Sequence, residues 1–195
     1  MGISIDKIYE LVGNREQVVI FEVGSADGTD TRQFLSKFGS NLKIYTFDPD
    51  PTNIKAMSSQ DGVDVKGNPN HKLRTDARHT FTPVAIAAQD GRTVFTRSRN
   101  VNGPGGGVDW GRYSGSIYEP KTIVNSPKYG NRWPMIKYDE KIEVETRSLD
   151  SFCEENSIDH IDFLWMDLQG AEKEVFLGAK NMLGKIDYIY TEYHE

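Results

Sequence analysis

The sequence has one cysteine, Cys153, among its 195 residues. A single thiol excludes an internal disulfide and a zinc site built from several cysteines. Cys153 shares one face of a predicted helix with Leu149 and Phe152, so we predict that it is a small buried core residue. The scarcity of cysteine is typical of a reducing compartment, and it favours a cytoplasmic location.

Long apolar runs are also missing. No stretch approaches the roughly eighteen apolar residues that a membrane span needs, and the first residues lack the pattern of a secretory signal peptide. The net charge of −6 argues against a nucleic acid or an anionic membrane as a partner. The length and the 37% apolar content suit one globular domain covering residues 1–195.

The charges are spread unevenly along the chain. Residues 66–99 contain seven Lys or Arg and two acids, whereas residues 139–195 contain fifteen acids and five bases. A basic middle section either faces an anionic substrate or forms a solvated surface. If the substrate is anionic, we expect Arg97, Arg99 and Arg112 to lie close to it.

Strand and helix patterns alternate along most of the chain. Alternation of this kind predicts an α/β fold, in which a doubly wound, Rossmann-like and mostly parallel sheet is linked by right-handed crossovers. β-branched and aromatic runs that end at glycine or an acid indicate the strands, and apolar residues at helical spacing indicate the helices. The predicted strands are 17–23, 42–47, 81–88, 161–166 and 186–193, and the helices are an N-terminal one within 1–16, then 29–38, 51–59, 148–156 and 171–183.

The middle of the chain breaks this alternation. Residues 97–140 form a predicted insertion between the third and fourth strands, flanked by a short strand at 93–96 and an edge strand at 141–145. Residues 100–116, NVNGPGGGVDWGRYSGS, hold too many glycines for a helix or a central strand. A long segment of this type is either a functional loop, here a lid that recognises the acceptor, or disordered.

The segment FEVGSADGTDT, residues 21–31, joins the first strand to a helix with the spacing Glu22-x-Gly24-x-x-x-Gly28. This is not the GxGxxG spacing that surrounds a pyrophosphate. An acid before the turn would repel a pyrophosphate and attract a cationic amine, and the glycines allow close approach of the backbone. The pattern indicates a ligand with a cationic amino-acid part, although an ordinary turn with a capping acid has the same letters.

Asp48 ends the second predicted strand, twenty residues after Gly28. An acid at that position accepts hydrogen bonds from both hydroxyls of an unmodified ribose. The alternative is a simple helix-entry turn at Asp48-Pro49. A cation, a ribose and a base together describe S-adenosyl-L-methionine better than NAD.

Several segments resemble the FkbM-type methyltransferases in their order and wording: FEVGSADGTDT, YTFDPDP, VAIAAQDGRTVF, SLDSFCEENSIDHIDFLWMDLQGAEKEVFLGA and IDYIYTE. The resemblance covers roughly residues 18–192. It implies the class I methyltransferase fold, S-adenosyl-L-methionine as methyl donor, and a hydroxyl oxygen of a small molecule or glycan as acceptor.

The resemblance also implies roles for individual residues. Asp167 would lie beside the transferred methyl, and the base that deprotonates the acceptor is expected among Asp167, Glu192 and His194. No spacing of carboxylates or histidines requires a metal, so we predict none. The residues expected to hold the cofactor are Glu22, Gly24, Ser25, Ala26, Asp27, Gly28, Asp48, Pro49, Ala85 and Asp167.

Two features depart from the family pattern. Gln169 stands where the family usually has Glu, and a neutral amide cannot act as a base. The sequence stops at Glu195, before the strand pair that normally closes the fold, so we expect either that those strands are missing or that a homo-oligomeric neighbour covers the edge.

Two other functions compete with methyl transfer. A nicotinamide-dependent dehydrogenase is disfavoured, because the sequence lacks both GxGxxG and a Tyr-x-x-x-Lys pair at Tyr188, where Glu192 follows instead. A non-catalytic, Rossmann-like module for nucleoside binding or assembly is favoured by Gln169 and by the short C-terminus.

Overall fold

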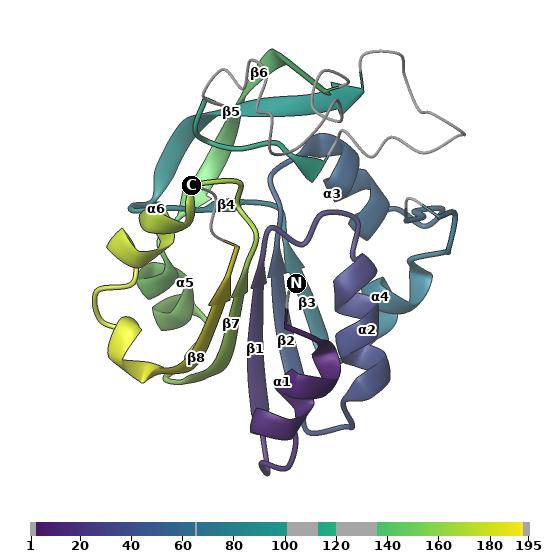
Figure 1. The fold of residues 1–195 in the computed structure, drawn as a ribbon, viewed down its shortest axis with the longest axis vertical. Helices are drawn as coiled ribbons and strands as arrows, with labels where there is room; N and C mark the ends of the chain where they lie inside the picture. Colours follow the sequence, from purple (N-terminus) through teal and green to yellow (C-terminus); the bar gives the residue numbers. More distant parts are fainter. Residues whose placement is uncertain (1–2, 65, 101–112, 120–135, 193–195) are drawn as a thin grey trace, which may run out of the picture.

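The computed structural model describes residues 3–64, 66–100, 113–119 and 136–192. Its larger sheet has the strand order β3-β2-β1-β7-β8, and all neighbouring strands are parallel (Figure 1). The strand order reverses between β1 and β7, where ligands bind in open α/β sheets. The predicted mostly parallel, doubly wound sheet is therefore confirmed. Its strands are β1 (Val18–Val23), β2 (Leu42–Phe47), β3 (His79–Thr82), β7 (Ile161–Met166) and β8 (Ile186–Thr191).

Helices cover both faces of this sheet. Phe34 of α2 and Phe38, which follows that helix, pack with Ile8 of α1 on one face, and Phe152 of α5 packs with Val175 of α6 on the other. Serine or aspartate caps begin several of these helices, as at Ser4, where the side chain accepts from the Lys7 N–H. The helices are α1 (Ile5–Val12), α2 (Thr29–Lys37), α3 (Pro51–Ser58), α4 (His71–Thr75), α5 (Leu149–Glu155), α6 (Glu172–Leu177) and the short 3-10 helix η3 (Leu183–Lys185).

Alternation along β1 decides which side chains reach which face. Val18 and Ile20 pack with α1 and α2, whereas Phe21 and Val23 pack with α5 and α6. Successive side chains of a strand point to opposite faces. Glu22 therefore shares the face of Val18 and Ile20 and lies beneath α2, a consequence that matters for the site.

A second, smaller sheet lies at the carboxyl end of the larger one (Figure 1). It has the strand order β4-β6-β5 and a small core of Ala85, Phe95 and Val144. β6 is parallel to β4 and antiparallel to β5. The two sheets together enclose the space in which the site is found. The strands of this sheet are β4 (Ala85–Ile86), β5 (Gly91–Asn100) and β6 (Ile136–Arg147).

The third predicted strand, 81–88, is wrong as one element. β3 ends at Thr82, and the chain passes through Pro83 into β4 of the second sheet. Proline has no N–H to donate, so it ends the ladder of the larger sheet. The prediction of an edge strand at 141–145 is also wrong, because β6 is longer and lies between β4 and β5.

The last predicted helix, 171–183, is shorter than expected. α6 ends at Leu177, and a Cβ added to Gly178 would lie 2.1 Å from the carbonyl oxygen of Ala87. The chain approaches the β4 backbone too closely there for any side chain. The Asp150 carboxylate then accepts from the N–H groups of Asn181 and Met182 and holds the turn that follows.

Parts of two predictions lie outside the described residues. Most of the glycine-rich segment falls within residues 101–112, and His194 falls within residues 193–195. In the described ranges, no helix is long and apolar enough to cross a membrane.

Replacing Phe21 should test the core on the side of α5. The Phe21 ring lies 5.1 Å from the Tyr45 ring, 5.5 Å from that of Phe47 and 5.8 Å from that of Phe152, measured between centroids. F21A removes these contacts and leaves a cavity, so the free energy of unfolding should fall by about 3–5 kcal/mol. Urea unfolding measures this, with V94A at an exposed position as the control. A loss below about 1 kcal/mol would contradict the packing described.

Candidate active site

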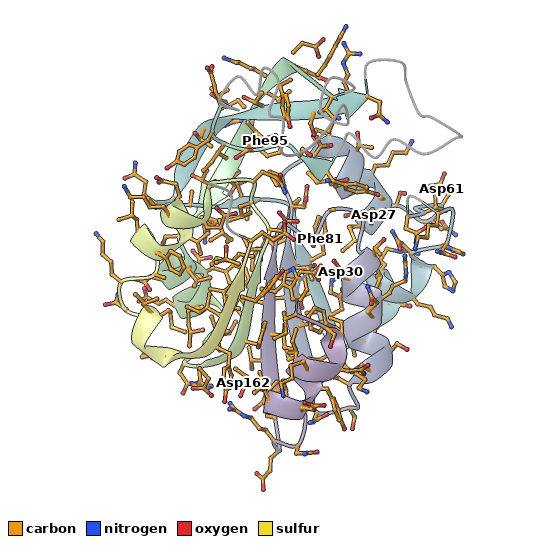
Figure 2. All side chains as sticks on the ribbon, viewed as in Figure 1. Asp27, Asp30, Asp61, Phe81, Phe95 and Asp162 are labelled. Atoms are coloured by element: carbon orange, nitrogen blue, oxygen red, sulfur yellow. The ribbon has the colours of Figure 1, made fainter. Side chains whose placement is uncertain are left out.

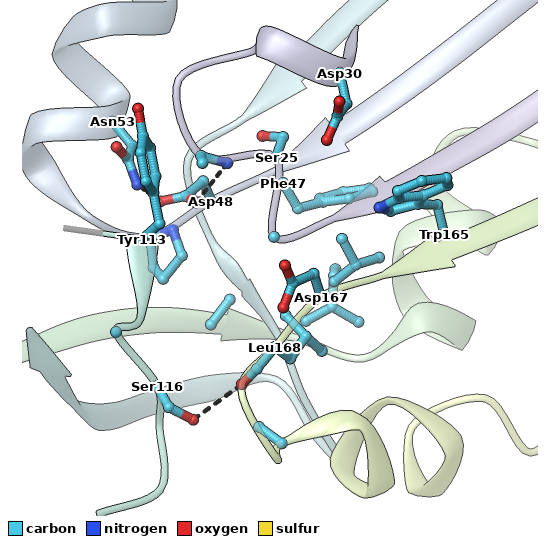
Figure 3. A pocket seen from close by; sticks show the side chains of 18 of the residues that line it. Ser25, Asp30, Phe47, Asp48, Asn53, Tyr113, Ser116, Trp165, Asp167 and Leu168 are labelled. Carbon is cyan, nitrogen blue, oxygen red and sulfur yellow. Dashed lines mark hydrogen bonds between the residues drawn. The ribbon is translucent and has the colours of Figure 1, made fainter. Parts of the chain in front are cut away.

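A cavity of about 380 Å³ lies between the carboxyl ends of β1, β2 and β7 and the second sheet (Figure 3). This volume is within the range of small-molecule sites. Residues predicted from five separate segments of the sequence meet in it. Its lining includes Gly24, Ser25, Ala26, Asp27, Asp48, Pro49, Ala85, Asp167 and Glu192 of the predicted set.

The turn between β1 and α2 brings the backbone close to the cavity. Gly24 has φ +89° and Ala26 has φ +48°, both in the left-handed region. A Cβ on Gly24 would lie 2.2 Å from the carbonyl oxygen of Asp167, so only glycine allows the ends of β1 and β7 to meet. The N–H groups of Gly24 and Ser25 both donate to the Phe47 carbonyl, which ties this turn to the end of β2.

Asp48 is the best-supported polar group of the cavity. One carboxylate oxygen, Oδ2, accepts from the Ala26 N–H at 2.9 Å; the other, Oδ1, accepts from the Asp50 N–H at 2.9 Å and from Asn53 Nδ2 at 3.1 Å. Burial raises the pKa of Asp48 to about 7, and these hydrogen bonds oppose that rise. The side chain is thus positioned by three donors and titrates near neutral pH.

Two buried polar atoms in the cavity wall lack a partner among the described residues. They are Ser25 Oγ and Asn53 Oδ1. Buried polar atoms in native proteins almost always have hydrogen-bond partners, supplied by protein, water or ligand. Both atoms are fully buried, so a ligand in the cavity reaches them only if the wall rearranges.

Asp167 lies at the end of β7 and is oriented by Gln169. The Gln169 Nε2 donates to Asp167 Oδ1 at 2.5 Å, from a backbone with φ +54°. The Glu172 carboxylate accepts from the Leu168 N–H and shapes the same turn. The amide that departs from the family pattern therefore holds the carboxylate at the strand end.

Residues 113–119 cross from the second sheet to the larger one. The Tyr113 hydroxyl donates to Asp27 Oδ2 at 2.8 Å, and Ser116 exchanges two backbone hydrogen bonds with Thr96. The Ser116 hydroxyl donates to the Leu168 carbonyl. These contacts hold Tyr113 in the lining of the cavity, which Asn53 and Asp48 also line.

The lining contains both apolar and acidic side chains. Lys66 is the one basic residue in the described lining, beside five acids. Such a surplus of negative charge favours a cationic ligand and opposes a pyrophosphate. The apolar side chains include Val84, Ala85, Ile86, Phe95 and Leu168, and the five acids are Asp27, Asp30, Asp48, Asp167 and Glu192.

Some lining residues were not predicted from the sequence. Asp30 lies in the first turn of α2 and faces the cavity beside Phe47 and Trp165 (Figure 3). Burial raises the pKa of Asp30, and the neighbouring Asp27 raises it further. Asn53 could have been found, because Pro51 at the helix start places Asn53 in the first turn after the Asp48 loop.

The structure does not place Glu22 where the prediction needs it. Glu22 is buried beneath α2, accepts from the Thr31 hydroxyl at 2.7 Å, and does not line the cavity. Burial raises its pKa well above the usual value, with further contributions from nearby acids such as Asp30. Glu22 faces α2 and not the cavity because side chains two residues apart on a strand, here Ile20 and Glu22, point to the same face.

Gly28, like Glu22, does not line the cavity. A Cβ there would meet Leu73 and Met57 at 2.5 Å, so this glycine, with φ +79°, serves the packing of α2 against α3 and α4.

The arginines that were expected to face an anionic substrate form ion pairs with other residues where the structure describes them. Arg97 pairs with Asp50 and Glu140, and Arg99 pairs with Asp139. Neither arginine lines the cavity, and Arg112 lies outside the described residues. The expectation that they face a substrate is not supported by these positions.

A possible metal-ligand group lies at the other end of the sheet. His160, Asp162 and Asp187 come together there, and Figure 2 shows Asp162 far from Asp27 and Asp30. Arg15 Nη1 bonds both carboxylates, so a cation already occupies the position between them. This group is a structural ion-pair network that joins the connection between α1 and β1, where Arg15 lies, to β7 and β8.

Gln169→Glu should destabilise the site in a pH-dependent way. Two carboxylates would then lie within hydrogen-bond distance, and their repulsion would lower the free energy of unfolding at pH 8 by roughly 1–2 kcal/mol for these partly exposed groups. At pH 5 a shared proton relieves the repulsion, so the deficit should shrink. Thermal unfolding at both pH values tests this, with Q60E at an exposed position as the control. Equal deficits at pH 5 and pH 8 would show that Gln169 does not contact Asp167.

Comparison with known proteins places the chain in a family. The model of the methyltransferase FkbM domain matches residues 22–195. The 2-O-methyltransferase NoeI of Sinorhizobium fredii (strain NBRC 101917 / NGR234) is 35% identical over 177 residues, which are 91% of this chain and 63% of that relative. This chain thus spans less than two thirds of the relative's length.

A solved structure gives a weaker similarity. The crystal structure of methyltransferase FkbM from Methylobacillus flagellatus KT has 13% identity and a TM-score of 0.46, over 91% of this chain and 34% of that one. The family model, in contrast, matches most of the chain. The chain belongs to the FkbM methyltransferase domain family.

Proposed function

We propose that this chain transfers a methyl group from S-adenosyl-L-methionine to a hydroxyl oxygen of a small molecule or sugar. The observation that carries the proposal is the cavity at the strand-order switch, where the buried Asp48 and the strand-end Asp167 line one space. Family membership supports methyl transfer, and the relative named a 2-O-methyltransferase supports oxygen as the acceptor atom.

The cavity fits the proposed donor in three respects. Its acids suit a sulfonium and an ammonium, its apolar side chains suit an adenine ring, and Asp48 suits a ribose. Gly24 and Ser25 let the backbone approach the ligand closely.

We assign the parts of the donor to separate walls. The adenine would lie against Ala85, Phe95 and Leu168, and the ribose beside Asp48 and Pro49. The amino-acid part would lie near Ser25 and toward Asp30, which takes over the role first given to Glu22. Asp27 would act indirectly, because its carboxylate is engaged by Thr29 and Tyr113.

The protein supplies alignment and a base. When bound, the donor provides an electrophilic methyl carbon, which an acceptor oxygen attacks in line. Asp167 and Glu192 both line the cavity and are the proposed bases; His194 stays a candidate. General-base assistance of this kind contributes about 10²–10⁴ in rate. Gln169 holds Asp167 in place while it accepts the proton.

We further propose a cytoplasmic setting, consistent with a buried Cys153 and no disulfide partner. The acceptor is proposed as uncharged, since the arginines near the second sheet are used in ion pairs.

Calorimetry and a turnover assay test the proposal together. S-adenosylhomocysteine should bind at micromolar concentration, and NAD should not, because the acidic lining repels a pyrophosphate. D167N keeps an acceptor for Gln169, so it should bind S-adenosylhomocysteine within a few-fold of wild type and lose about 10²–10⁴ in methyl transfer to hydroxylated acceptors. NAD binding in place of S-adenosylhomocysteine would overturn the proposal, and D167N with full turnover would remove Asp167 as the base.

Cofactor affinity should depend on pH through Asp48. Its pKa is about 7 in the free protein, and ribose hydroxyls that donate to the carboxylate favour the charged form. Binding then lowers this pKa, so affinity should rise several-fold as pH increases from about 5.5 to about 7.5, and level off above it. D48N cannot titrate and should show no such rise. A flat wild-type profile, or the same rise in D48N, would contradict this role.

A further inference from the structure

A groove of about 730 Å³ adjoins the cavity that is proposed to hold the methyl donor. It lies between residues 3–6, α2 and the loop that carries Asp64 and Asn68. The groove and the cavity have part of their walls in common, so a ligand in the groove can reach the cavity directly. The residues that line both are Thr29, Asp30, Lys66 and Trp165.

The charges along the groove are balanced. Arg32 forms an ion pair with Asp64, and Lys37 Nζ lies 2.5 Å from a carboxylate oxygen of Asp6. A neutral ligand leaves both ion pairs intact, whereas a phosphate or sulfate would compete with these carboxylates for the cations. The cavity, in contrast, has five acids and one base in its described lining. The acids of the groove are Asp6, Asp30 and Asp64, and its cations are Arg32, Lys37 and Lys66.

Most of the groove is also polar. Gln33, Ser36 and Asn68 bring two amides and a hydroxyl, groups that both donate and accept hydrogen bonds. An acyl or polyketide chain would remove water from these groups and offer no hydrogen bonds in return, which is unfavourable. A ligand rich in hydroxyls replaces the bonds to water with bonds of the same kind. The apolar exceptions in the described lining are Ile3, Ile5 and Trp165.

Trp165 provides a flat ring where the groove meets the cavity (Figure 3). Its ring packs edge-on against Phe34, with 5.8 Å between centroids, and its centroid lies 4.6 Å from that of Tyr190. These contacts fix the indole before a ligand binds. The C–H groups of a sugar ring carry partial positive charge and pack against the negative face of an aromatic ring. A fixed indole beside polar groups is therefore suited to a sugar.

Asp30 is held at the same boundary. Gln33 Nε2 donates to Asp30 Oδ1 at 2.6 Å, so a residue of the groove orients a carboxylate that lines the cavity. The amino-acid part of the donor is assigned to the neighbourhood of Asp30, and the sulfonium lies between that part and the ribose. A hydroxyl that enters past Trp165 would thus approach the side of the donor that carries the methyl group.

We infer that this groove binds the acceptor, and that the acceptor is an uncharged carbohydrate of more than one sugar ring. The inference rests on the proposed function, since it names the substrate class of that reaction. The groove has more volume than the cavity of about 380 Å³, so it has room for a ligand larger than the donor. The acceptor oxygen forms a bond to the methyl carbon while the carbon–sulfur bond breaks. Its proton passes to a carboxylate of the cavity, and S-adenosylhomocysteine is released.

Ser36 allows the groove to be blocked without a change in the cavity. It lies at an exposed position of α2 and lines the groove but not the cavity. S36W puts an indole into the groove. The matched control is S58W, at an exposed position of α3 that lines neither of the two.

The experiment measures donor binding and acceptor binding separately. Calorimetry with S-adenosylhomocysteine should give the same affinity for wild type, S36W and S58W. Each protein, saturated with S-adenosylhomocysteine, is then applied to an array of neutral, sulfated, phosphorylated and sialylated glycans. Wild type and S58W should bind neutral oligosaccharides and S36W should not. With the best neutral glycan as acceptor, S36W should raise KM by about tenfold or more, because it removes acceptor binding.

Three results would overturn the inference and leave the proposed function standing. They are wild type that binds S-adenosylhomocysteine but no glycan, binding confined to the anionic glycans, and equal glycan binding by S36W and wild type. Wild type that does not bind S-adenosylhomocysteine refutes the proposed function itself. Should S36W unfold, S36K places a smaller side chain with good helix propensity at the same position, and it should weaken neutral-glycan binding in the same direction.

Discussion

The Asp48 carboxylate is the group on which the rest of the site depends. It is buried at the end of β2, and its donors come from the β1–α2 turn through Ala26 and from the start of α3 through Asp50 and Asn53. A buried acid is costly unless several donors satisfy it. These donors therefore fix the two turns relative to each other, and the cavity between them is a consequence of that arrangement.

Close backbone approach completes the same region. Gly24 lets β1 meet the end of β7, the second sheet contributes Ala85 and Phe95 to the lining, and Tyr113 of the segment 113–119 contacts Asp27. Gln169 then orients Asp167 at the neighbouring strand end. The acids around the cavity have different surroundings. Asp48 accepts from three donors, whereas burial and a neighbouring acid raise the pKa of Asp30, so one small space contains carboxyl groups in unlike environments.

The sequence allowed much of the frame to be predicted. β2 and β7 have the predicted bounds, because apolar runs that end at an acid leave little ambiguity about buried parallel strands. The place of Asp48 followed from the same reasoning. Glu22 lies under α2 and outside the lining, because the two-residue period of β1 directs its side chain to that face.

Other features could not be predicted because they depend on contacts between distant segments. The transfer of the chain at Pro83 into a second sheet depends on β6, about sixty residues further on. Tyr113 and Asp27 are separated by 86 residues, and no local pattern joins them. The role of Gln169 could not be predicted either, because it depends on the hydrogen bond that its amide makes with Asp167.

A crystal structure of this chain with S-adenosylhomocysteine is the most direct test of the central claim, that the cavity at the strand-order switch is shaped for a cationic nucleoside. The account predicts the ribose oxygens within hydrogen-bond distance of Asp48 and the adenine against Ala85 and Phe95. A nucleoside bound elsewhere, or an Asp48 carboxylate that remains out of reach of the ribose, would contradict it.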